Sequence, residues 1–267
     1  RIKFVLFPRI RLELTQVAIH DRNSDTILLS AKKLDLVLRL VPLLRRQLVG
    51  KRLLIEEPTL TLRRDRYGHW NVLDREKPIP ASDDEALEMM SRVFRIREAT
   101  LAGGTLLVVD EARPDGVRVL KLENVEAALK IHLERGEADM HFSAAHSSTQ
   151  GPSAFSFSGT FRRAEQQTLS LESANRSTFP IQFDGQAEVA NLGLRDAADF
   201  FGPRPVPELL HGRVNARSAM RIMPGVAGYD VLLSDLTGNM DQLQVSGNAS
   251  LSGLLAPQPT FAITFSA

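Results

Sequence analysis

The sequence has no cysteine, one tryptophan and two tyrosines among its 267 residues, and it has no long apolar run. The absence of cysteine excludes disulfide scaffolds, thiolate zinc sites, iron–sulfur clusters and cysteine nucleophiles. Because a membrane-spanning helix needs about 18 or more apolar residues in succession, no segment of this sequence is expected to cross a bilayer. The few non-Phe aromatic residues come without any RRM, KH or helix-turn-helix pattern, so no nucleic-acid partner is predicted.

The motifs of catalytic and metal sites are also missing. The sequence contains no Walker loop, no G-x-G-x-x-G, no G-x-S-x-G elbow and no H-E-x-x-H helix, and no two of its six histidines are three or four residues apart. Adjacent carboxylates occur at Glu56-Glu57, Asp83-Asp84 and Asp110-Glu111. Because neighbours on a strand point to opposite faces, we interpret these pairs as turn or strand-end residues, the first of them at a strand entry before Pro58. We therefore expect no enzyme, no catalytic residues, no metal and no cofactor.

Charge is balanced overall but unevenly distributed. Lys and Arg number 33 against 32 Asp and Glu, yet residues 1–66 hold 15 basic and 7 acidic residues. A basic N-terminal region is typical of proteins that meet an anionic partner, such as a phosphate backbone or a lipid headgroup surface. The alternative is that these side chains only solvate the outward faces of strands, since they are interleaved with Leu and Ile.

Alternation of apolar and polar residues is the dominant pattern along the chain. Residues 181–189, IQFDGQAEV, place Ile181, Phe183, Ala187 and Val189 on one face and polar residues on the other, as a half-buried strand requires. The same period recurs near residues 33–40, 127–134, 155–161, 214–222, 229–233 and 243–251, with turn residues between the runs. Strand following strand predicts a mainly β fold with antiparallel pairing in a meander.

Two or three short helices are expected within this β framework. Pro42 opens a helix that Gly50 ends, Ser82 and Glu85 form a capping box before a second helix, and a third covers Asp196–Phe201. Between them, the polar, proline-containing stretch Asp74–Asp84 has the composition of a surface linker. This gives an N-terminal unit at 1–73, a linker and helix at 74–94, and continuing strands over 95–267.

The segment from Leu34 to Asn71 resembles the N-terminal signature of the AsmA-like family. In that signature an alternating strand and a P-L-L turn precede P-x-L-x-L-x-R-D-x-x-G-x-W-N. The matching residues here are Pro42, Leu43, Leu44, Pro58, Leu60, Leu62, Arg64, Asp65, Gly68, Trp70 and Asn71. We expect Pro58 at an edge or strand start, and Asp65 to Gly68 as a turn with Trp70 beneath it. Later segments are similar to the family's glycine-interrupted strands, with Gly212, Gly238, Gly247 and Gly253 in those places.

The resemblance implies a fold, a location and a function. AsmA-like proteins are held in the inner membrane of Gram-negative bacteria by one N-terminal helix, with the remainder in the periplasm, and are similar to bridge-like lipid-transfer proteins whose strands form a curved apolar trough. The sequence begins at Arg1 without methionine and ends in an alternating run, so we expect a piece of a longer protein that lacks this anchor. The expected partners are phospholipid, the inner-membrane surface through the basic N-terminal region, and other envelope proteins.

The expected function is therefore support of outer-membrane biogenesis by carrying or guiding phospholipid along an apolar β-groove. The residues predicted to line that groove are Phe155, Phe157, Phe161, Ile181, Phe183, Val214, Met220 and Ile222. One alternative is a structural or chaperone-like assembly factor for outer-membrane proteins that acts through exposed strand edges. Another is a closed β-sandwich binding module, in which these residues would be ordinary core.

Overall fold

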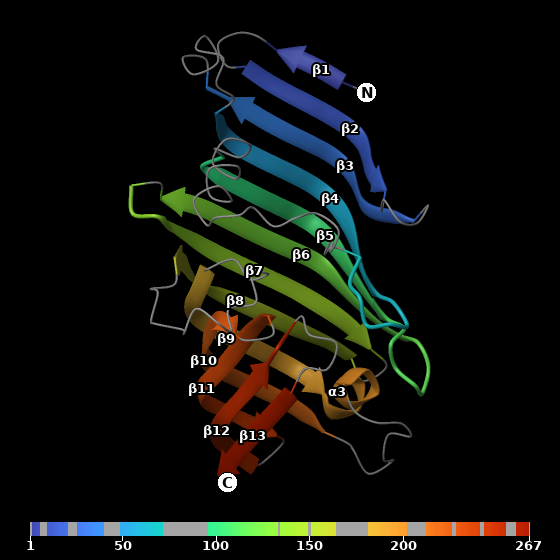
Figure 1. Ribbon diagram of the computed structural model, residues 1–267, viewed down its shortest axis with the longest axis vertical. Coiled ribbons are helices and arrows are strands. Elements are labelled where there is room, and N and C mark those ends of the chain that lie inside the picture. The colour runs from blue at the N-terminus through green and yellow to red at the C-terminus, as the bar shows by residue number, and fades with distance from the viewer. Residues whose placement is uncertain are drawn as a thin grey trace, which may run out of the picture.

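Thirteen strands follow one another in a single sheet in the computed structural model, in the same order as in the sequence (Figure 1). The structure describes residues 2–5, 10–20, 26–39, 49–71, 96–132, 134–148, 151–163, 181–201, 212–225, 228–240, 243–254 and 260–266. The strands are β1 (Ile2–Val5), β2 (Ile10–His20), β3 (Ile27–Leu38), β4 (Gly50–Arg64), β5 (Glu98–Asp110), β6 (Arg118–His132), β7 (Glu137–Ser148), β8 (Gly151–Arg163), β9 (Ile181–Gly193), β10 (Arg213–Gly225), β11 (Gly228–Met240), β12 (Leu243–Ser252) and β13 (Thr260–Ser266).

The predicted antiparallel meander is confirmed for every neighbouring pair of strands except one. β4 and β5 run parallel, with Leu53 opposite Ala99 and Leu62 opposite Val108. The prediction was wrong at this pair. Parallel neighbours need a connection of about a dozen residues or more, and residues 65–97 between β4 and β5 are long enough to provide one.

Among the residues that the structure describes, one helix is present, α3 (Leu194–Phe201), where the sequence predicts a helix over Asp196–Phe201. The two other predicted helices, near Pro42 and after Ser82, and the Asp74–Asp84 linker lie outside the described residues. α3 contacts both β6 and β9. It therefore bridges two strands that are not neighbours in the sheet.

The position of Pro58 corrects a second expectation. It lies inside β4, opposite Ala31 of β3, and is buried rather than at a strand start. Glu57 immediately before it has a φ of 48°, so regular pairing is already interrupted where the proline lacks its N–H. The pair Glu56-Glu57 is accordingly in mid-strand and not at a strand entry.

Residues with positive φ interrupt the alternation in several strands. Their φ angles are 48–56°, at Gln16, Glu57, Asn124, Asn191 and Asp235. In β4 the apolar positions run Leu53 and Ile55 before the break, then Pro58 and Leu60 after it. Strict alternation would have placed Pro58 and Leu60 on the opposite face. The one residue with left-handed backbone, Glu57, thus keeps them on the same face as Leu53 and Ile55.

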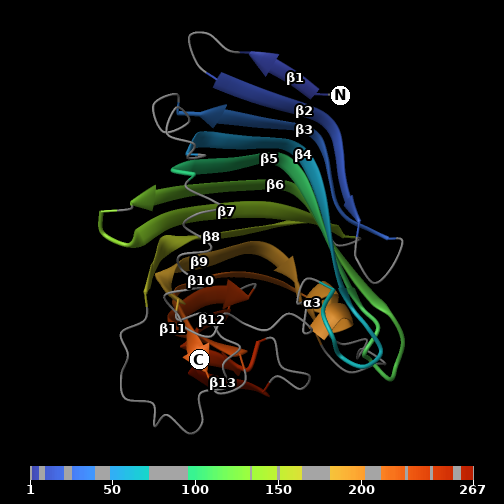
Figure 2. The same cartoon turned by 45° about the horizontal axis from the view of Figure 1, so that its top comes forward.

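The breaks in β2–β6 fall side by side on neighbouring strands. The register brings Glu57 beside Gly103, which has a φ of 65°, and the N–H of Gly103 donates to Oε1 of Glu126 at 2.9 Å. Lys32 of β3 forms an ion pair with Glu57 along the same line. Figure 2 shows the strands of this part of the sheet bending over together, which gives the sheet its open, curled form.

Little of the molecule is buried in the manner of a closed core. The accessible surface is 18194 Å², whereas a compact protein of 29.6 kDa exposes about 11,600 Å². The buried apolar residues among those described are Ile10, Ala31, Val49, Val125, Ala144, Phe183 and Ala249. The described strands form one sheet and not two facing ones, which contradicts the closed-sandwich alternative.

Candidate functional site

One face of the sheet is apolar from the first strand to the last, and we call it the apolar face. A single row of directly paired residues crosses all 13 strands without a polar residue. The row consists of Phe4, Leu12, Leu36, Leu53, Ala99, Leu129, Met140, Gly159, Gly185, Met220, Leu233, Ala249 and Ile263. With neighbouring strands about 4.8 Å apart, the row extends over about 58 Å.

The side chains of this face are mostly half-buried. Leu53, Leu129, Met140, Met220 and Leu233 all have this intermediate exposure. The described strands form a single sheet, so among the described residues this burial comes mainly from neighbours on the same face. The apolar face is thus a surface that offers apolar side chains to something outside the sheet.

The eight residues predicted to line a groove share this face, on β8, β9 and β10. Phe155, Phe157 and Phe161 come from β8; Ile181 and Phe183 from β9; Val214, Met220 and Ile222 from β10. The register sets Phe161 opposite Phe183, and Phe183 opposite Ile222. Their role in binding lipid stays a prediction.

Four phenylalanine rings form a continuous cluster across β7, β8 and β9. The rings of Phe142 and Phe157 stack with centroids 4.8 Å apart, Phe157 meets Phe183 edge-on at 6.0 Å, and Phe161 lies 4.8 Å from Phe183. Phe142 is absent from the predicted site. The alternation of Ala138, Met140, Phe142 and Ala144 was the signal that could have placed it there.

Phe183 differs from the other members of the cluster because its side chain is 1% exposed. Its ring lies over the glycine pair Gly159 and Gly185, where a Cβ atom on either residue would come within 2.8 Å of Phe183 Cζ. Phe183 is therefore buried against the backbone of the sheet, whereas the half-buried Phe155, Phe157 and Phe161 stay accessible from the face.

Sequence reasoning also missed the part of the apolar face that β2–β6 contribute. Rows such as Leu14, Leu34, Ile55, Leu101 and Ala127 continue it across these strands. The alternation was visible there in the sequence, but the breaks at Gln16, Glu57 and Asn124 hide which residues share a side.

Charged residues end the apolar face where β4, β5 and β6 meet their turns. Arg64, which follows Leu60 and Leu62 on this face, lies 3.6 Å from Asp110. Arg118, 2% exposed, pairs with Asp115 and donates from Nη1 to the carbonyl of Phe200 in α3 at 2.9 Å. Figure 2 shows α3 on the side towards which the strands bend, so the apolar face is the inner side of the curl.

The Arg64–Asn71 part of the signature forms the predicted turn. The N–H of Asp65 donates to the carbonyl of His69 at 2.8 Å, Gly68 has a φ of 85°, and Trp70 returns to pair with Arg64. Burial alone would raise the pKa of Asp65, but hydrogen bonds from the N–H groups of His69 and Tyr67 outweigh it and lower the pKa. Asn71 completes the turn by donating to the carbonyl of Thr61.

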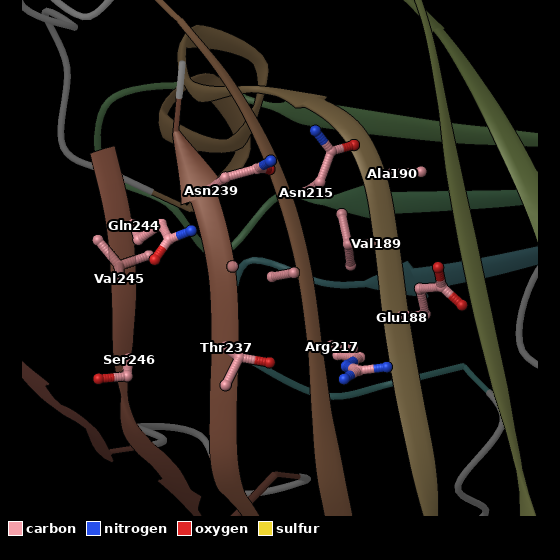
Figure 3. Close-up of a pocket in the computed structure, with 12 residues that line it drawn as sticks. Glu188, Val189, Ala190, Asn215, Arg217, Thr237, Asn239, Gln244, Val245 and Ser246 are labelled. Atoms are coloured by element: carbon pink, nitrogen blue, oxygen red, sulfur yellow. The ribbon is translucent and has the colours of Figure 1, made fainter. Parts of the chain in front are cut away.

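An open hollow of about 610 Å³ lies on the opposite, polar face of β9–β12. Figure 3 shows Asn215 and Asn239 on neighbouring strands, with Arg217 and Thr237 one row away. The register extends these rows to Gln244 and Ser246 of β12. This hollow is polar and is separate from the apolar face.

Two further features are absent from the part of the chain that the structure describes. No group of three or more His, Asp or Glu is placed to hold a metal ion there. None of the described helices is both long and apolar enough to cross a membrane.

An open curled sheet with one apolar row across all of its described strands defines a class of protein that presents an extended apolar surface. The comparison with protein families is in agreement, because the model of the AsmA family matches residues 1–174. The chain belongs to the AsmA family, a family associated with the bacterial envelope. A search of the curated proteins found no match.

Proposed function

We propose that this protein carries or guides phospholipid along the apolar face, and thereby supports outer-membrane biogenesis in the periplasm. The observation that carries the proposal is the row from Phe4 to Ile263, which is apolar across all 13 strands. A lipid tail that moves along the sheet, perpendicular to the strands, would meet apolar side chains throughout. The family assignment supports the same interpretation.

The energetics fit a conduit better than a tight receptor. Exposure of each methylene to water costs about 0.8 kcal/mol, so a 16-carbon tail crossing water alone meets a barrier of about 12 kcal/mol. Contact with a continuous apolar surface removes most of that barrier. Since a tail has similar free energy in a bilayer and on such a surface, no specific pocket and no enzyme chemistry are required.

The proposal is tested by native mass spectrometry of the protein prepared without detergent, followed by lipid extraction. We expect bound phospholipid on the unmodified protein and its loss in Phe157→Asp, because the half-buried Phe157 is accessible from the apolar face. The matched control is Ser158→Asp, which puts the same charge on the next residue of β8, on the opposite, exposed side. Phe183→Asp is expected to destabilise the fold instead, since Phe183 is almost fully buried and a carboxylate there would lose its contact with water.

Two results would overturn the proposal. One is a protein that carries no lipid under these conditions; the other is an equal lipid content in Phe157→Asp and Ser158→Asp. Circular dichroism of both variants keeps the comparison valid, because each must retain the β content of the unmodified protein.

One observation favours a second candidate, an assembly factor that pairs with client strands. β13 has no neighbour on its outer side among the described strands, and Phe261 there is 61% exposed. An unpaired strand edge with exposed apolar residues is able to accept a further strand. A synthetic peptide of alternating apolar residues that protects the β13 amides from hydrogen exchange would favour this candidate.

A further inference from the structure

A second hollow, of about 460 Å³, lies outside the apolar face between the turn after β4 and the turn from β5 to β6. Arg63, Arg66 and Arg113 line it, with Glu111 as its one acidic residue. The remaining lining residues are small or apolar: Ala112, Pro114, Gly116 and Val117. Three guanidinium groups against one carboxylate make the hollow suited to anions.

The arginines are only partly used by the protein itself. Nε of Arg63 donates to Oε1 of Glu111 at 2.9 Å, and Nη2 lies 2.6 Å from the same oxygen. Nε of Arg113 donates to Asp110 at 3.2 Å, so within the described residues its two Nη groups make no hydrogen bond. The described residues offer no hydrogen-bond or ion-pair partner to the exposed guanidinium of Arg66.

The turn that presents Arg66 is held in place. Oδ1 of Asp65 accepts from the N–H of Tyr67 at 2.9 Å and from the N–H of His69 at 2.8 Å. Gly68 closes the turn by donating to the carbonyl of Asp65. Arg66 and Tyr67 are therefore displayed outward from a rigid loop.

Apolar side chains stand exposed beside the arginines. Tyr67 is 82% exposed, Val117 55% and Val119 58%, and Val117 itself lines the hollow. The register Arg63, Val109, Val119 shows that Val119 is on the same polar face as Arg63. Exposed Tyr and Val residues next to Arg are typical of a protein edge that enters the headgroup region of a bilayer.

We propose that this edge, formed by Arg63, Arg66, Tyr67, Arg113, Val117 and Val119, docks the protein onto an anionic phospholipid surface. The arginines bind headgroup phosphates in the hollow, and Tyr67, Val117 and Val119 enter the interface. The docking edge is distinct from the apolar face. It takes Arg63 and Arg66 from the basic N-terminal region and its other residues from further along the chain. The docking edge gives the lipid carrier of the proposed function a fixed contact with the bilayer. The biological role of this edge rests on the proposed function, but its binding to anionic lipid does not.

The test is flotation with vesicles of phosphatidylcholine and phosphatidylglycerol in equal parts, and with vesicles of phosphatidylcholine alone. We expect binding to the mixed vesicles that weakens as salt is raised, and about fivefold weaker binding for Arg66→Gln, the usual contribution of one arginine near an anionic surface. Val117→Ser combined with Val119→Ser should weaken binding further by reducing insertion. The matched control is Arg135→Gln, since Arg135 is also exposed and lies in the turn between β6 and β7, at the opposite strand ends.

Equal losses for Arg66→Gln and Arg135→Gln would overturn the docking edge, because binding would then follow net charge alone. Absence of binding to both kinds of vesicle would also overturn the docking edge, even if inorganic phosphate binds at Arg66. The lipid content of Arg66→Gln, measured by native mass spectrometry, separates the two proposals. Loss of docking with normal lipid content removes only the docking edge, and docking by a lipid-free protein removes only the lipid carrier.

Discussion

At the residue scale, the packing of the aromatic cluster depends on two glycines. A Cβ added to Gly159 would lie 2.3 Å from the carbonyl oxygen of Asp184 and 2.5 Å from Cα of Gly185, as well as 2.7 Å from Phe183 Cζ. Two of these three atoms belong to the backbone and cannot move away without displacing β9. The glycine pair thus permits the close approach that buries Phe183.

Gly159→Ala is therefore expected to lower the free energy of unfolding by about 2 kcal/mol or more. Gly136→Ala is the control, because its Cβ would meet nothing within 4 Å and its φ of 65° alone should cost about 1 kcal/mol. Urea unfolding of both variants measures the difference. A loss for Gly159→Ala no greater than for Gly136→Ala would contradict the packing argument.

The polar face depends at this scale on Asp184. Its carboxylate accepts hydrogen bonds from Arg162 and Arg221, both at 2.6 Å, and from Gln182 at 2.7 Å, so it joins β8, β9 and β10. Burial alone would raise the pKa of Asp184, but the hydrogen bonds from Arg221 and Gln182 and the charge of Arg162 lower it. Because the pKa is lower in the folded state, this stabilisation is present at neutral pH and is lost as the pH falls below about 4.

Asp184→Asn should accordingly cost about 1 kcal/mol of stability at neutral pH, a modest value because both arginines are half exposed. The cost should shrink when unfolding is measured below about pH 4, where the carboxyl of the unfolded chain begins to be protonated while the native carboxyl, with its lowered pKa, is still charged. Asp199→Asn, an exposed position without a partner among the described residues, is the control and should change little at either pH. A cost for Asp184→Asn that does not vary with pH would refute this role.

At the element scale, alternation predicted most strands correctly, including β9 and β10, whose apolar residues lie where the period of two puts them. Alternation could not show that the apolar residues on both sides of an interruption share one face. A period of two contains no information about a single residue with left-handed backbone. The parallel β4–β5 pair was equally hidden, since pairing direction depends on residues 65–97 and not on either strand. The predicted site, confined to β8–β10, was limited by the same difficulty.

Asn124 is a position where the interruption itself is testable. It has a φ of 50° in β6 and is exposed, so its backbone conformation is its main structural requirement. We expect Asn124→Val to destabilise the protein by about 1–2 kcal/mol, since a β-branched residue is poorly suited to left-handed backbone. Asn124→Gly should be nearly neutral, and thermal unfolding of the two variants decides the matter; similar melting temperatures for both would contradict it.

At the scale of the whole molecule, the uninterrupted apolar row predicts that a single charge should obstruct transfer. Met140 lies near the middle of this row, on β7. In an assay of lipid transfer between donor and acceptor vesicles, Met140→Asp should reduce the rate at least tenfold, because a tail passing the carboxylate loses its apolar contact on both sides. His141→Asp, the next residue and exposed on the polar face, should transfer at the original rate. Equal rates for the two variants would show that lipid does not pass along this face.

The parallel contact between β4 and β5 also bears on how the chain acquires its structure. Most other neighbouring strands are joined by connections short enough to form early, so the segments β1–β4 and β5–β13 each contain mainly local pairings. Joining them requires pairing of two strands that residues 65–97 separate in the sequence, and such non-local pairing is slow relative to hairpin formation. We expect each segment to gain its strands first and the β4–β5 seam to form last, so this seam sets the folding rate of the sheet.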